Sequence, residues 1–151
     1  LEYSDINVTE QLAEVVQLYE YAAEEEGVTL KSTVADDIQL HADQTRMMQV
    51  WVNLLDNAIK YNRRGGMVAI DVQAVDGIVQ VSFQVSGIGI SEQEIVRIWE
   101  RLYRGDRSRT RQGLGLGLNY VKAVVEAHGG TIQVQSDLNH GSTFIVEIKQ
   151  S

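Results

Sequence analysis

The stretch ADQTRMMQVWVNLLDNAIKYN, residues 42–62, decides how this chain folds. Asp43 is a favourable helix cap, and the apolar residues behind it return every three or four positions. They form one stripe that we expect to be buried: Met47, Val50, Trp51, Leu54, Ala58 and Tyr61. The pattern predicts an amphipathic helix from Asp43 to about Asn62 with a separate polar face.

The polar face of this helix carries Asn53, Asn57 and Lys60, at positions i, i+4 and i+7. Asparagine is a mediocre helix former, so two on one face need a reason. Amide oxygens one turn apart can both reach a Mg²⁺ ion or its waters, and a lysine one turn on can meet phosphate. A solvated face with two incidental asparagines is the alternative, and these residues alone leave both open.

The flanking segments predict the other elements of a single domain. Asn7 and Glu10 start a first helix that ends at Gly27. Asp76-Gly77 joins two alternating runs, which is a strong hairpin signal. The remaining candidates are strands at 28–34 and 38–42, a helix at 91–103, a helix from 113–117 to 129–130, and strands at 131–136 and 142–149. Adjacent strand pairs favour a two-layer α/β (α+β) sandwich, a mixed and largely antiparallel sheet of about five strands with three to four helices on one face.

Two glycine-rich loops each precede a predicted helix, in VSFQVSGIGISEQE (81–94) and GLGLGLNYVKAVVEAHGG (113–130). Glycines at a helix N-terminus let backbone N–H groups face a phosphate. A flexible linker is the alternative, but glycines alternating with leucines are not a linker composition. Between the loops, RIWERLYRGDRSRTRQ (97–112) holds arginines at 101, 104, 107, 109 and 111, which suggest an anionic partner or a solvated loop. A phosphate lid has to move, so these two readings are compatible.

Composition excludes several classes of protein. The chain has no cysteine, so disulfides and Cys-ligated zinc are absent, and its three histidines lie far apart in sequence. The net charge of −8 argues against non-specific nucleic-acid binding. No signal peptide or apolar run long enough to span a membrane is visible, so we expect no direct membrane contact. Proline is also absent, although average usage of about 5% predicts several, which raises the hypothesis of a redesigned sequence.

In order and spacing, these segments resemble the catalytic ATP-binding domain of sensor histidine kinases, with the Bergerat-type fold of gyrase, Hsp90 and MutL. The segment 42–62 resembles the asparagine box, SGIGIS (86–91) the first glycine box, and RIWERLYRGDRSR (97–109) the phenylalanine box and ATP lid. GLGLGLNYVKAVVEAHGGTIQVQS (113–136) and HGSTFIVEI (140–148) resemble the second glycine box and the closing strands.

The resemblance implies roles for individual residues. Asn57 would be the Mg²⁺ ligand, with Asn53 supporting the ion or the phosphates, and Lys60 and Tyr61 would line the phosphate and ribose side. Gly87 and Gly89 would shape the adenine pocket, and Arg104 with neighbouring lid arginines would meet phosphate. The second glycine loop would hold the phosphates through Gly113, Leu114, Gly115, Leu116, Gly117 and Leu118.

The implied function is that of a Mg-ATP-binding kinase domain that donates the γ-phosphoryl group to a histidine on a separate dimerisation domain, and through it to a response regulator. A cytoplasmic location and a monomeric isolated domain follow from the same resemblance. The acceptor histidine is not expected in this chain, and His128 at a helix end is expected to be structural.

The main departure of the match from the family is at one position, and the others are milder. The family's first glycine box reads D-x-G-x-G, and aligning the glycines places its aspartate at Val85. That carboxylate accepts a hydrogen bond from the adenine amine, which valine cannot do. Ser86 points to the opposite face of its strand, so it is a poor replacement. The sequence therefore also fits a degenerate or redesigned domain that binds little ATP and serves as a scaffold or interaction module.

Overall fold

The computed structural model describes residues 1–33, 37–86, 117–137 and 141–151. Within these ranges it contains three helices, α1 (Val8–Glu25), α2 (Gln44–Lys60) and α4 (Gly117–Ala127). The strands are β1 (Tyr3–Asn7), β2 (Thr29–Thr33), β3 (Gln39–Asp43), β4 (Met67–Val75), β5 (Ile78–Val85), β6 (Thr131–Asp137) and β7 (Gly141–Lys149). No described helix is long and apolar enough to cross a bilayer.

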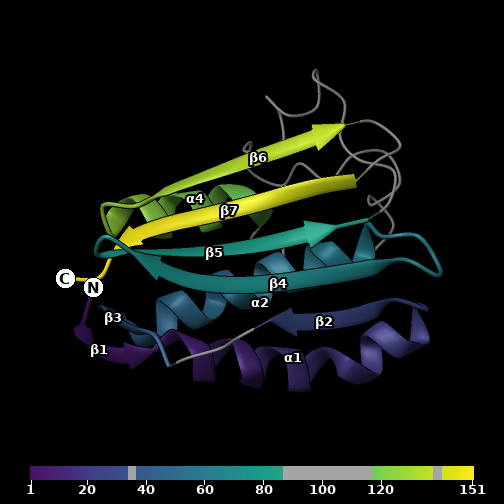
Figure 1. Ribbon diagram of the computed structural model, residues 1–151, viewed down its shortest axis with the longest axis horizontal. Helices are drawn as coiled ribbons and strands as arrows, with labels where there is room; N and C mark the ends of the chain where they lie inside the picture. Colours follow the sequence, from purple (N-terminus) through teal and green to yellow (C-terminus); the bar gives the residue numbers. More distant parts are fainter. Residues whose placement is uncertain (34–36, 87–116, 138–140) are drawn as a thin grey trace.

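Five strands form one mixed sheet in the order β2-β4-β5-β7-β6, and all three helices lie behind it in a second layer (Figure 1). The β2–β4 pair is parallel, and the other three pairs are antiparallel. A small second sheet joins β1 to β3. The predicted two-layer α/β sandwich with a largely antiparallel sheet is confirmed.

Helix α2 lies in the middle of the helical layer, between α1 and α4 (Figure 1). Asp43 caps it as predicted, because Asp43 Oδ1 accepts a hydrogen bond of 2.9 Å from the backbone N of Arg46. The apolar stripe packs against the inner face of the sheet, where the rings of Trp51 and Phe83 stack with centroids 6.4 Å apart. Both side chains are almost completely buried, which fixes the rotation of α2 about its own axis.

The local signals for the first helix and the hairpin are also confirmed. Asn7 accepts a 2.9 Å hydrogen bond from the backbone N of Glu10 and caps α1. Asp76 and Gly77 have φ angles of 54° and 77°, the left-handed conformations that a tight hairpin turn between β4 and β5 requires.

The structure differs from the sequence-based predictions in three features. The sequence reading gave β2 and β3 as strands around one turn, yet β2 joins the main sheet while β3 pairs with β1. Strand β1 was not predicted, because five mostly exposed residues carry no clear alternation. Tyr61 was assigned to the buried stripe, but it is the C-cap of α2 and 37% exposed. The predicted helix at 91–103 lies outside the described residues.

We expect Gln11 to be the polar residue on which α1–α2 packing depends. Gln11 Oε1 accepts a 2.9 Å hydrogen bond from the buried indole Nε1 of Trp51, and Gln11 Nε2 donates to the carbonyl O of Gln44. Gln11→Leu leaves both groups buried without this partner, so we expect a loss of about 1–3 kcal/mol in the free energy of unfolding, measured in urea. The matched change at an exposed site of α1, Gln17→Leu, is expected to be nearly neutral, and equal losses in the two variants would contradict this role.

Candidate functional site

The predicted polar face of α2 is present, and it turns away from the apolar stripe. Asn53 is 7% exposed, and its Nδ2 donates a 2.8 Å hydrogen bond to the carbonyl O of Gln49 in the preceding turn. That bond directs the amide nitrogen back along the helix and leaves the carbonyl oxygen as the end of the side chain suited to a cation. Asn57 is half-buried one turn later on the same face. Amide oxygens at this spacing fit a hard ion such as Mg²⁺.

Lys60 continues this face and is held by a carboxylate that the sequence reading did not identify. Lys60 Nζ lies 2.9 Å from Asp56 Oδ2, and both side chains are largely buried. Asp56 also acts on Tyr19 of α1. Burial, followed by the charge and the hydrogen-bonding of Asp56, raises the pKa of the Tyr19 phenol to about 12. One carboxylate therefore links α1 to the candidate phosphate-facing lysine.

A second group of side chains ties α2 to α4. Arg46 Nη1 donates to the Tyr120 hydroxyl at 2.8 Å, and that hydroxyl donates to Gln49 Oε1. Gln49 thus contacts α4 through its side chain while its carbonyl holds Asn53. The polar face of α2 therefore begins at Arg46, seven residues before Asn53, with Gln49 between them. A search for polar residues at helical spacing upstream of Asn53 would have found both.

His128 joins the same two helices at the other end of α4. Its Nε2 accepts a 3.0 Å hydrogen bond from the backbone N of Asp43, and its Nδ1 lies 2.8 Å from the carbonyl O of Val124. The backbone N–H groups of Arg46 and then Glu2 hold the pKa of the Asp43 carboxyl below its usual value. The contacts agree with the structural role expected for His128. No three His, Cys, Asp or Glu residues gather into a metal-binding group in the described parts of the chain.

Val85 ends β5 with its side chain facing the helical layer, and it is 6% exposed. Ser86 has a different environment. Its Oγ accepts a 2.7 Å hydrogen bond from the backbone N of Met67, and its own backbone N donates to the Met67 carbonyl. Asn62 adds to this connection, because its Nδ2 also donates to the Met67 carbonyl at 3.1 Å. The hydroxyl of Ser86 is therefore engaged with the start of β4, and Val85 is the last described residue of β5 that faces the helical layer.

An open cavity of about 390 Å³ lies beside Val85, at the ends of β5, β6 and β7. Its described lining is uncharged and consists of Met67, Gln84, Val85, Ser86, Gln135, Ser136, Gly141, Ser142 and Thr143. Asn53, Asn57 and Lys60 are not part of this lining. The cavity is therefore a feature separate from the polar face of α2.

The structure brings some of the predicted site residues together and leaves others untested. Asn53, Asn57, Lys60 and the more exposed Tyr61 follow one another along the last turns of α2. Gly117, with φ of +32°, and the partly buried Leu118 open α4, which packs against α2. The predicted residues Gly87, Gly89, Arg104, Gly113, Leu114, Gly115 and Leu116 lie outside the described residues.

The fold and the polar face of α2 agree with a known protein family. Residues 42–151 match the family described as "Histidine kinase-, DNA gyrase B-, and HSP90-like ATPase". The match includes α2, β4 to β7 and α4, so the chain belongs to this family of ATPases.

Relatives place the chain among the sensor kinases of that family. The sensor histidine kinase CusS of Escherichia coli O6:H1 is 36% identical over 143 residues, which is 93% of this chain and 29% of CusS. The catalytic domain of the histidine kinase ThkA superposes with a TM-score of 0.87 at 30% identity, covering 99% of this chain and 97% of that domain. Full-length ShkA, solved in complex with AMPPNP, gives a TM-score of 0.86 at 28% identity, covering 100% of this chain and 32% of ShkA. The chain thus corresponds to the catalytic domain of sensor histidine kinases and spans under a third of the length of CusS.

The contact between Tyr19 and Asp56 predicts a dependence of stability on alkaline pH. Because the folded state raises the pKa of Tyr19 from 10.0 to about 12, it favours the neutral phenol. This contribution to stability is complete below pH 10 and is lost as the pH rises through about 12. We expect Tyr19→Phe to flatten the fall in the free energy of unfolding between these two values. Tyr21→Phe is the control, because Tyr21 is 73% exposed, and an equal flattening in that variant would argue against the contact.

Proposed function

We propose that this domain binds Mg-ATP along the polar face of α2 and supplies the γ-phosphoryl group to a histidine on a separate dimerisation domain. The observation that carries the proposal is the alignment of Asn53, Asn57 and Lys60 along one side of a helix whose apolar stripe is locked in the core. Membership of the ATPase family and the AMPPNP complex of ShkA support it.

In this proposal, the chain contributes positioning and charge rather than covalent chemistry. The amide oxygens of Asn57 and Asn53 would hold the ion, which neutralises phosphate charge when bound. The ammonium of Lys60, oriented by Asp56 at 2.9 Å, would face the phosphates. The backbone N–H groups at the start of α4, from Gly117 on, point in the direction that suits an anion. Tyr61, exposed at the end of α2, is placed to line the ribose side.

The part of the proposed site that would hold the adenine base fits ATP less well than the part that would hold the phosphates. Val85 is buried and has no acceptor, and Ser86 is engaged with Met67. An adenine amine placed against Val85 would lose a hydrogen bond to a charged acceptor, at about 1.5–3 kcal/mol. That corresponds to about a tenfold to hundredfold loss of affinity. The same observation favours the second candidate function, a kinase-like domain that binds little nucleotide and acts as an interaction module.

The proposed partners follow from the kinase function. ThkA has been solved in complex with its response regulator protein TrrA, and this structure superposes on the chain with a TM-score of 0.84 at 28% identity. By analogy, this domain would act with a histidine-bearing helical domain and, through it, with a response regulator. ATP as the phosphoryl donor places the proposed site of action in the cytoplasm.

A calorimetric titration of Mg-ATP into the chain and into Val85→Asp tests the proposal. We expect weak binding by the parent and binding about tenfold to hundredfold tighter by the variant. Because the variant buries a carboxylate, its free form should be less stable than the parent, and nucleotide should restore the melting temperature. Val85→Asn, which offers an uncharged acceptor, should fall between the two.

Asn57→Ala is the control for the phosphate end. In the Val85→Asp background it should remove Mg²⁺-dependent binding without lowering the melting temperature of the free protein by much, since Asn57 is only half-buried. Absence of binding in both the parent and Val85→Asp would overturn the ATP proposal and leave the interaction module. Equal affinity in the parent and Val85→Asp would instead show that Val85 does not adjoin the base.

A further inference from the structure

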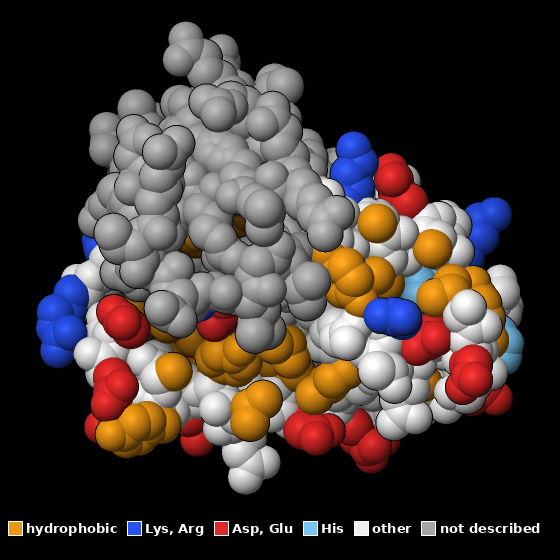
Figure 2. Space-filling view, turned by 180° about the vertical axis from the view of Figure 1, so that it is seen from behind, with side chains coloured by type: hydrophobic (Ala, Val, Ile, Leu, Met, Phe, Trp, Pro, Cys, Tyr) orange, Lys and Arg blue, Asp and Glu red, His pale blue; other side chains and the backbone are white. Residues whose placement is uncertain are grey.

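The net charge of the chain is concentrated in its first 30 residues. They contain eight acids and no lysine or arginine: Glu2, Asp5, Glu10, Glu14, Glu20, Glu24, Glu25 and Glu26. The rest of the chain holds the other 13 acids and all 13 lysines and arginines, so it is formally neutral. The surplus charge of −8 therefore belongs to this first segment, which contains β1 and α1 and the two flanking acids Glu2 and Glu26. In Figure 2, acidic side chains interleaved with hydrophobic ones follow the lower rim of the molecule, where α1 lies in Figure 1.

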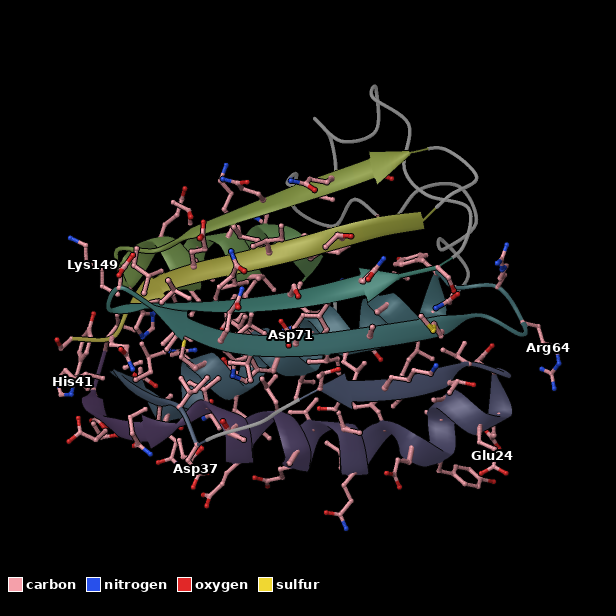
Figure 3. All side chains as sticks on the ribbon, viewed as in Figure 1. Glu24, Asp37, His41, Arg64, Asp71 and Lys149 are labelled. Atoms are coloured by element: carbon pink, nitrogen blue, oxygen red, sulfur yellow. The ribbon has the colours of Figure 1, made fainter. Side chains whose placement is uncertain are left out.

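The outer face of α1 also exposes two large apolar side chains. Leu18 is 66% exposed and Tyr21 is 73% exposed. They are three residues apart and therefore neighbours on the helix surface, with Glu14 one turn before Leu18 and Glu25 one turn after Tyr21. We call these four residues the α1 face. Figure 3 shows the adjacent Glu24 projecting from the same helix away from the rest of the molecule.

The acids of α1 are not explained by the stability of the helix. The C-terminal end of a helix is favourable for cations, yet α1 ends in three consecutive glutamates and has no basic residue in its last turn. Glu10 and Glu14, like Glu20 and Glu24, are spaced as repelling i, i+4 pairs. Within the described parts of the chain, no glutamate of α1 forms an ion pair. Arg64, the cation nearest the end of α1, donates to the carbonyl O of Glu25 rather than to a carboxylate.

We propose that the α1 face docks a cationic amphipathic helix of a partner protein. Leu18 and Tyr21 would contact the apolar stripe of that helix, and its lysines or arginines would face Glu14, Glu24 and Glu25. Ridges formed by residues three and four apart are the surfaces by which helices pack on each other. From Glu14 to Glu25 the face extends about 17 Å, which suits a partner segment of about three turns.

Charge decides between this occupant and the alternatives. An anionic membrane surface or a nucleic acid would be repelled by the carboxylates that flank Leu18 and Tyr21. A cationic helix would be attracted at a distance, and its charges would also offset the unfavourable position of Glu24 and Glu25 at the end of α1. Leu18 and Tyr21 are exposed on the outer side of α1, whereas Asn53, Asn57 and Lys60 belong to α2, so the α1 face contains none of the candidate site residues. The inference does not require that the domain bind nucleotide.

The test uses a fluorescent peptide of the length of α1, with leucines at i, i+3, i+4 and i+7 and lysines elsewhere, titrated with the full chain in an anisotropy assay. A peptide of the same composition in shuffled order has the same charge without the apolar stripe. We expect the ordered peptide to bind more tightly, and the Leu18→Gln, Tyr21→Gln double variant to weaken its Kd about tenfold or more. Val75→Gln, at a site 57% exposed on the hairpin, is the apolar control and should have no effect.

A second variant separates loss of binding from loss of folding. Glu24→Gln with Glu25→Gln should raise the melting temperature of the free chain, because it removes charge from the negative end of α1. The same variant should weaken peptide binding and reduce its dependence on salt. Glu126→Gln, on the exposed side of α4, is the charge control.

Several outcomes would overturn the proposal. Equal binding of the shuffled peptide would show that the apolar stripe is not recognised. If the Leu18→Gln, Tyr21→Gln double variant bound the peptide with unchanged affinity, the α1 face would not be the binding site. The same conclusion would follow if Val75→Gln and Glu126→Gln weakened binding as much as the substitutions on the α1 face. Binding of the chain to vesicles of anionic lipid that depends on Leu18 and Tyr21 would assign the face to a membrane instead.

Discussion

The burial of one face of α2 is the constraint on which the rest of the structure depends. Trp51 lies in contact with the sheet through Phe83 and with α1 through the side chain of Gln11. A helix held on both sides in this way has no freedom to rotate, so the directions of its other side chains are fixed. Asn53 and Asn57 lie about a third of a turn from the buried stripe, at the edge of the core. The candidate site is therefore positioned by apolar packing that none of its own residues provides.

The packing of the helical layer on the sheet also explains why Val85→Asp is expected to change both nucleotide binding and the stability of the free domain. Strand β5 alternates, so every second side chain from Val79 to Val85 faces the helical layer. A valine at the last of these positions extends the apolar surface and satisfies the strand pattern. A carboxylate there would oppose the pattern and would persist only if a ligand repaid its burial. In this chain, valine at position 85 favours the stability of the strand, whereas the aspartate of the family motif would favour binding of the ligand.

Much of this arrangement could be predicted because it depends on local chemistry. The caps at Asn7 and Asp43 and the Asp76–Gly77 turn are recognisable from a few adjacent residues, and the stripe of α2 from its period. Pairing between distant segments is different. Nothing in Thr29–Thr33 specifies parallel pairing with β4, and β1 forms only because β3 is placed beside it. Asp56 was missed for the same reason, since its partners are Lys60 on its own helix and Tyr19 on another.

Helix α2 also gives the domain two faces with different physical character. On the side of α4, polar side chains are connected to one another by hydrogen bonds, as Arg46, Tyr120 and Gln49 are. On the side of α1, the glutamates are exposed to solvent and supply most of the surplus negative charge of the chain. Sequences tend to depart from local stability rules where function requires it. The glutamates at the C-terminal end of α1 are unfavourable for the helix dipole, whereas the buried stripe of α1 follows the expected apolar period. The acidic outer face of α1 is therefore a surface that the proposed nucleotide site does not use, and the carboxylates beside Leu18 and Tyr21 suit a cationic partner.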